Sequence, residues 1–168
     1  MSSKRKLIEG WIDKAGNHLQ SGRSYLKSPH LVSESVQASQ ESVELSVKSI
    51  LAFLNVEYPP SHGWDRDQFS KIARQVRDKH IIERLRVQNL DYTVRVPRLL
   101  LFANFWAQFY LPAKYGFGAG YLAPPQDLFE KQEAELAVQH AEECWRAASH
   151  LRYLTSEQLD AIADGSIP

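Results

Sequence analysis

The stretch that decides the fold is Leu31–Asn55, LVSESVQASQESVELSVKSILAFLN. Its apolar residues recur three or four positions apart, which is the spacing of one face of an α-helix. They are Val32, Val36, Val43, Val47, Ile50, Leu51 and Leu54. A spacing of four also places Gln40, Glu44 and Lys48 on one side of the same helix. The stretch therefore predicts a long helix with an apolar stripe and a polar stripe.

The segments around this helix also have helical periodicity. We expect a helix over about residues 4–27 that ends at Ser28-Pro29, and one over about 67–80 that follows a loop at Tyr58–Gly63. Further helices are expected over about 97–110, 127–154 and 156–163, with Asp127 as the N-cap of the second of these.

Two segments interrupt this pattern. Residues 112–125 hold three glycines and three prolines and are expected to form a long loop, and residues 86–96 are a weak candidate for a strand. The fold class is therefore predicted to be all-α: an up-and-down bundle of about five long helices plus a short C-terminal helix. The expected boundaries are 1–154 for the bundle and 155–168 for the short helix and tail.

Composition limits the class of protein. The 168 residues include 20 basic and 20 acidic side chains, so the net charge is zero. This balance excludes a wholly basic nucleic-acid coat and an acidic solvating chain. The charge is segregated, however, because residues 1–27 hold six basic and two acidic side chains, whereas residues 126–168 hold three basic and nine acidic ones. We expect these segments to meet in the fold and neutralise each other, or to leave one face basic.

The single cysteine, Cys144, excludes an internal disulfide and a cysteine-based zinc cage, and it fits a reducing compartment. No secretory signal follows the basic N-terminus, and the longest uncharged stretch, 99–113, is too short to cross a bilayer. We therefore expect a cytoplasmic protein without a membrane segment.

Motifs for metals and common cofactors are absent from the sequence. No Glu-x-x-His or His-Glu-x-x-His pair is present, and neither is a phosphate-binding loop or a Gly-x-Ser-x-Gly elbow. We therefore expect no metal and no cofactor.

Aromatic residues crowd residues 101–121, and the last of them lie beside a lysine. Lys114, Tyr115 and Tyr121 are a candidate binding site, because a cation with exposed aromatic rings can hold a phosphate and stack a base. The alternative is that these rings pin the loop onto the bundle. The stripe of Gln40, Glu44 and Lys48 has two interpretations as well: a solvated face, or a polar seam that lines a cleft or a dimer axis.

Arg74 and His80 are the candidate catalytic residues. A cation that orients a phosphate and an imidazole that moves protons can cleave RNA without a metal, with the ribose 2′-OH as nucleophile. His62 lies in a predicted loop and is interpreted as a turn or helix-entry residue.

Two blocks of the sequence resemble the HEPN domain (higher eukaryotes and prokaryotes nucleotide-binding). Residues 37–54 are similar to the family's helix with Gln-x3-Glu-x3-Lys, which is followed by a loop with a histidine, here His62. Residues 109–116, FYLPAKYG, are similar to the family's Tyr-x-Pro-x-Arg-Tyr-Pro, and a long helix with Glu133-Ala134 near its start follows. The resemblance covers about residues 5–154.

The resemblance implies a helical bundle that commonly forms a homodimer and binds a nucleotide or RNA phosphate through Lys114, Tyr115, Tyr121, Gln40, Glu44 and Lys48. It also implies an alternative, a metal-independent ribonuclease paired with a nucleotidyltransferase-type antitoxin. The family's ribonuclease motif is Arg-x4-6-His, but Lys114 stands at the arginine position and Ala119, Gly120 and Tyr121 where the histidine is expected. This motif is therefore expected to be degenerate. A further alternative is a helical interaction module without a ligand.

Overall fold

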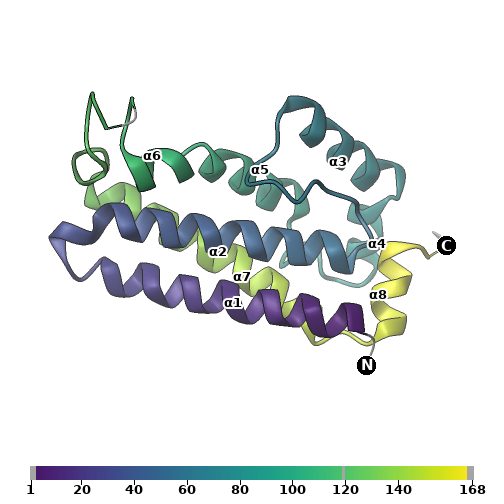
Figure 1. Ribbon diagram of the computed structural model, residues 1–168. Coiled ribbons are helices and arrows are strands. Elements are labelled where there is room, and N and C mark those ends of the chain that lie inside the picture. Colours follow the sequence, from purple (N-terminus) through teal and green to yellow (C-terminus); the bar gives the residue numbers. More distant parts are fainter. Residues whose placement is uncertain (1–2, 119, 166–168) are drawn as a thin grey trace.

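The computed structural model describes residues 3–118 and 120–165, and within them the chain is helical (Figure 1). The helices are α1 (Ser3–Tyr25), α2 (Val32–Phe53), α3 (Arg66–Asp78), α4 (Ile81–Val87), α5 (Val96–Ala107), α6 (Tyr110–Tyr115), α7 (Lys131–Arg152) and α8 (Ser156–Ala163). Short 3-10 turns lie at Pro29–Leu31 and Pro125–Asp127. The predicted all-α bundle is confirmed. The weak strand candidate at 86–96 is wrong, because these residues form the end of α4, a turn and the start of α5.

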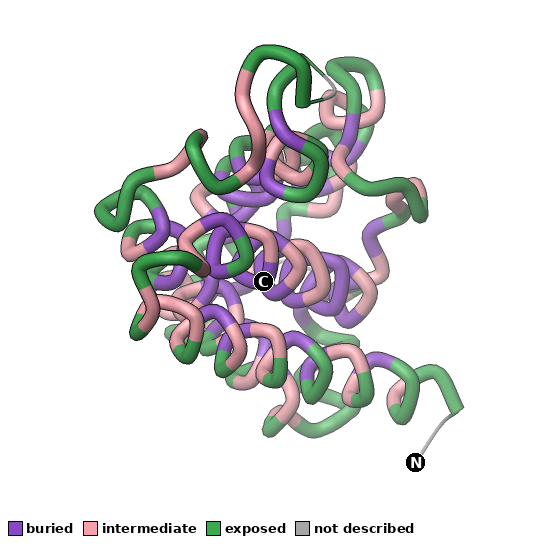
Figure 2. The backbone as a smooth tube through the Cα atoms, turned by 60° about the vertical axis from the view of Figure 1, so that its left-hand side comes forward, coloured by how far each residue is buried: buried purple, intermediate pink, exposed green. Residues whose placement is uncertain are grey.

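α2 is the central helix of the bundle. α1 and α7 run along it lengthwise, and α5 and α6 lie on its other side (Figure 1). Small residues let these helices approach closely, because short side chains permit a short distance between the helix axes. The buried serines of α2 are Ser33, Ser35, Ser39, Ser42, Ser46 and Ser49, and the buried alanines of α7 are Ala134, Ala137, Ala141, Ala147 and Ala148. Figure 2 shows that buried and exposed positions alternate along the helices.

The predicted start of the long helix at Asp127 and the predicted loop at 112–125 both need correction. α7 begins at Lys131, because the backbone N–H of Glu130 donates to Glu133 Oε2 at 2.8 Å and so fixes the first turn there. Asp127 lies instead in a 3-10 turn and does not cap α7.

The segment 112–125 is not a loop throughout, because α6 occupies its first four residues. Pro112 is the third residue of α6, where a backbone N–H has no partner within the helix in any case. α6 ends at Gly116, whose φ of +84° is unfavourable for other residues. A Cβ there would also lie 2.5 Å from the carbonyl oxygen of Ala123, so glycine is what allows the following loop to close on itself.

The segregated charges meet across helices. Arg23 of α1 pairs with Glu142 of α7 at 2.8 Å, and Arg152 of α7 pairs with Asp13 of α1 at 2.6 Å. The first pair joins a basic residue of the first helix to an acidic residue of the C-terminal part, as expected, and the second pair has the opposite sense. None of the helices described is long and apolar enough to cross a membrane.

Candidate functional site

The polar stripe of α2 meets a loop and α6, and a carboxylate lies at its centre. Glu44 Oε2 accepts hydrogen bonds from Gln40 Nε2 at 3.0 Å and is 3.0 Å from His62 Nδ1. Glu44 Oε1 accepts from Lys48 Nζ at 2.6 Å. We call Gln40, Glu44, Lys48 and His62 the Glu44 network. Gln40 is only 2% exposed, and the side chains of Glu44 and Lys48 are 12% and 11% exposed, so the stripe is a buried seam and not a solvated face.

Lys48 uses all of its hydrogen-bonding capacity inside the protein. An ammonium group has three N–H donors. In addition to Glu44, Lys48 Nζ donates to the backbone carbonyls of Pro60 at 3.1 Å and Ser61 at 2.9 Å. Lys48 therefore fastens the loop between α2 and α3 onto α2, and its charge is compensated without a ligand.

The electrostatics of Glu44 keep it ionised. Burial alone raises the pKa of this carboxyl, but hydrogen bonds from Lys48 and His62 outweigh burial and hold the pKa of Glu44 below its usual value. A charged carboxylate is an acceptor only, so it orients every donor around it.

His62 leaves the loop at the point where the loop contacts α5. The next residue, Gly63, has a φ of +71°, and a Cβ at this position would lie 2.8 Å from Cβ of Ala107. Only glycine fits both the backbone conformation and this close approach. The His62 side chain is 62% exposed, although its Nδ1 is held by Glu44.

The His62 ring connects the Glu44 network to α6. It stacks on the ring of Tyr110, with centroids 4.8 Å apart and planes inclined by 9°. Lys114 Nζ lies 5.6 Å from the centroid of Tyr110 and 5.2 Å from that of Tyr115, and 3.5 Å from the Tyr110 hydroxyl. We call Tyr110, Lys114 and Tyr115 the Lys114 platform. Lys114 and Tyr115 are exposed and Tyr110 is half-buried, and no carboxylate pairs with Lys114 in the described part of the chain.

The tyrosines of the platform also favour the charged form of the lysine. The hydroxyl groups of Tyr115 and Tyr110 raise the pKa of the exposed Lys114 ammonium. The cation is therefore permanent at neutral pH, and it lies beside two aromatic rings in contact with solvent.

Other candidate residues lie outside this arrangement. Tyr121 is 93% exposed in the loop after α6, and no side-chain hydrogen bond or ring contact joins it to the platform in ranges 3–118 and 120–165. Ala119 lies outside the described residues. Arg74 of α3 and His80, which follows that helix with a φ of +51°, are both exposed. No hydrogen bond, ion pair or ring contact joins these two side chains among the described residues.

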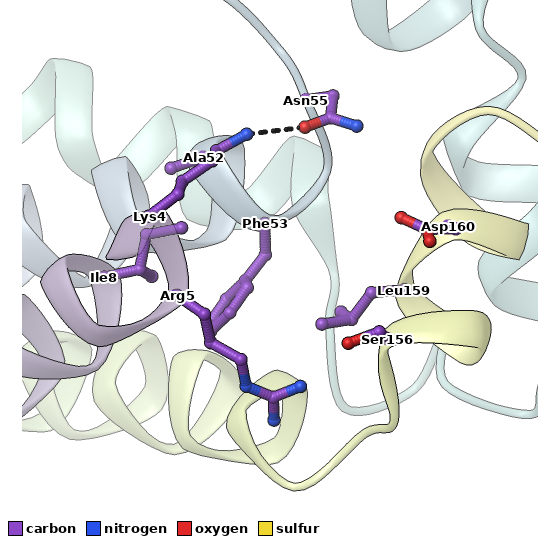
Figure 3. A pocket seen from close by; sticks show the side chains of 9 residues that line it. All are labelled: Lys4, Arg5, Ile8, Ala52, Phe53, Asn55, Ser156, Leu159 and Asp160. Carbon is purple, nitrogen blue, oxygen red and sulfur yellow. Dashed lines mark hydrogen bonds between the residues drawn. The ribbon is translucent and has the colours of Figure 1, made fainter. Parts of the chain in front are cut away.

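A separate cavity lies at the other end of the bundle, where α1, α2 and α8 meet (Figure 3). Its volume of about 110 Å³ is small beside the several hundred Å³ of ligand pockets. Its cations are already engaged: Lys4 Nζ donates to Asn55 at 2.7 Å, and Arg5 donates to the backbone carbonyls of Arg152 and Leu154 at 2.7 and 3.0 Å. This cavity is therefore not the candidate site. No group of three or more His, Cys, Asp or Glu residues able to hold a metal occurs within the described ranges.

Sequence reasoning missed His62 and Tyr110 as members of the site. The sequence interpretation of His62 is a turn or helix-entry residue, and the sequence singles out Tyr115 and Tyr121 but not Tyr110. The sequence does contain a clue to His62. A glutamate in the middle of a buried helix requires hydrogen-bond donors, and a histidine in the following loop is able to supply one.

A comparison with family models identifies the family of the chain. The model of the HEPN domain matches residues 8–151, a span that contains the Glu44 network and the Lys114 platform. The chain belongs to the HEPN domain family, a helical family of nucleotide-binding and ribonuclease proteins. No curated protein and no solved structure matches the chain.

Proposed function

We propose that this HEPN domain binds a nucleotide or an RNA phosphate at the Lys114 platform. The observation that carries the proposal is the exposed Lys114 ammonium, which lies between two tyrosine rings and has no carboxylate partner among the described residues. An ammonium attracts a phosphate as a point charge, and aromatic rings stack bases of any sequence. Tyr115 supplies an accessible ring, and Tyr121 in the adjacent loop supplies a second one.

The proposal gives the α2 residues a supporting role. The three donors of Lys48 are all used inside the protein, and the buried Glu44 carboxylate already receives three donors of the protein. Gln40, Glu44 and Lys48 hold the loop and His62 against α6, and thereby shape the surface next to Lys114.

The test is titration calorimetry of the protein with ATP, GTP and a short single-stranded RNA at low salt. Lys114→Ala is expected to weaken binding at least about tenfold, because one phosphate contact is lost. Lys71→Ala, which removes another exposed lysine on α3, is the matched control and is expected to bind like the wild type. Absence of binding to all three probes, or equal binding by the two variants, rejects the proposal.

The proposal also holds that the family's ribonuclease motif is degenerate. Lys114 stands where the family has arginine, and it lacks the bidentate fork that grips a phosphate. The expected result is that RNA stays intact after long incubation in EDTA. Cleavage in EDTA that disappears in His80→Ala would instead support the ribonuclease alternative, with Arg74 and His80 as the catalytic pair.

A homodimer is part of the same proposal, because HEPN domains commonly dimerise. Large apolar side chains of α5 and α6 are exposed in the single chain, namely Leu101, Phe105 and Leu111. Such residues are typical of surfaces that are covered by a partner. Light scattering during size-exclusion chromatography is expected to give twice the mass of the chain, and Leu101→Glu is expected to give the monomer. A monomeric wild type contradicts this part of the proposal.

A further inference from the structure

Glu44 holds one ring nitrogen of His62, and the other ring nitrogen has no protein partner among the described residues. Its Nδ1 lies 3.0 Å from Glu44 Oε2, and an ionised carboxylate only accepts, so the proton of the neutral ring is on Nδ1. This arrangement leaves a lone pair on Nε2. Nε2 has no hydrogen-bond partner among the residues described, and the ring is 62% exposed.

This lone pair differs from the acceptors of the platform, because Nε2 only accepts, whereas the tyrosine hydroxyls both donate and accept. Lys114 has three N–H donors and no acceptor, and the Tyr110 hydroxyl oxygen already receives one of these donors. A ligand held there by its phosphate therefore finds donors for its phosphate oxygens. A hydroxyl group of the ligand both donates and accepts, and Nε2 of His62 is able to receive its proton in a hydrogen bond.

The position of His62 suits a sugar hydroxyl. The His62 and Lys114 side chains both contact Tyr110, the first by stacking and the second through its ammonium. In a nucleotide the ribose lies between the phosphate and the base. A phosphate on Lys114 and a base on the neighbouring tyrosine ring place the ribose next to this group of side chains.

We infer that His62, oriented by Glu44, accepts a hydrogen bond from the ribose 2′-OH and so makes the site selective for ribonucleotides over deoxyribonucleotides. This inference rests on the proposed function, since it concerns the same site. The 2′-OH is the group that distinguishes RNA from DNA, and a site that hydrogen-bonds a hydroxyl discriminates against the analogue without it. One hydrogen bond corresponds to about tenfold in affinity.

The experiment compares two pairs of probes by calorimetry: ATP with 2′-deoxy-ATP, and a short oligouridylate with its deoxy counterpart. It is done at about pH 8, where free imidazole is neutral. The wild type is expected to bind the ribose forms about tenfold more tightly. His62→Phe keeps a ring on Tyr110 but removes the acceptor, so it is expected to bind both members of each pair with the wild type's affinity for the deoxy form. His150→Phe, an exposed histidine on α7, is the matched control and is expected to keep the preference.

Glu44→Gln tests the positioning role. The amide places no net charge beside Nδ1 and no longer fixes the tautomer, so the ribose preference is expected to shrink while the deoxy probes bind as before. Equal binding of ribose and deoxy probes by the wild type, or an undiminished preference in His62→Phe, overturns the inference and leaves the phosphate site standing. No binding of any probe overturns the proposed function as well.

Discussion

Glu44 and Lys48 form an ion pair of 2.6 Å that is nearly closed to solvent. Removing one partner of a buried pair leaves the other charge uncompensated, which costs several kcal/mol. Lys48→Met is therefore expected to lower the free energy of unfolding by about 3 kcal/mol, measured by urea denaturation.

The control for this prediction is an exposed pair with the same spacing on α7, Lys131 and Glu135, at 3.5 Å. Lys131→Met is expected to change the free energy of unfolding by less than about 0.5 kcal/mol. Equal effects of the two substitutions would contradict the structural importance of the buried pair.

Gly63→Ala is expected to destabilise the fold by about 1–2 kcal/mol. The residue has a left-handed φ, and its added Cβ would meet Ala107 at 2.8 Å. Because Gly63 follows His62, nucleotide binding is expected to weaken in the same variant. Gly10→Ala is the control: nothing lies within 4 Å of its Cβ, and α1 is helical there, so it is expected to stabilise the protein by about 0.5–1 kcal/mol. A neutral Gly63→Ala would show that the loop can move away without cost.

Stability is expected to fall in mild acid because of His140. Its Nδ1 accepts from Trp106 Nε1 at 3.1 Å, and its ring stacks on Phe102 at 3.8 Å. Burial, and then the nearby charge of Arg98, lower the pKa of His140 in the folded state. The imidazole of His140 therefore binds a proton more readily in the unfolded chain than in the folded one. The contribution of neutral His140 to the free energy of unfolding is complete above the unfolded pKa of about 6.5. It is lost as the pH falls through the lower pKa of the folded state.

The measurement compares urea unfolding of the wild type and His140→Gln at about pH 7.5 and about pH 5. The wild type is expected to lose more stability between the two pH values than the variant, whereas His150→Gln is expected to follow the wild type. An identical loss in all three proteins would show that other groups cause the acid sensitivity.

Cys144 is expected to be inert in the native protein. It is fully buried in α7, and burial strongly raises the pKa of its thiol. Thiolates react and thiols do not, so a thiol reagent is expected to modify Cys144 at least about 100-fold more slowly in the folded than in the guanidinium-unfolded protein. Fast modification of the folded chain would mean that α7 opens readily.

The longer helices were predictable because each depends on local periodicity, whereas the short helices α4 and α6 were not predicted as separate helices. The start of α7 was not, since Asp127 and Glu130 are both acceptable N-terminal residues, and the hydrogen bond from Glu130 N–H to Glu133 decides between them only once the chain is folded. The polar stripe shows a different limit. Lys48 is buried because the carbonyls of Pro60 and Ser61 cover it, and helical spacing carries no information on where a later loop will lie.

The attachment of that loop to Lys48 has a consequence for affinity. Residues that become ordered only when a ligand arrives reduce the net binding free energy by their lost conformational entropy. Here Pro60 and Ser61 are fixed by α2, and His62 is fixed by Glu44, before any ligand is present. The fold has thus already met the entropy cost of ordering this loop, and under the proposed function a ligand does not pay it again.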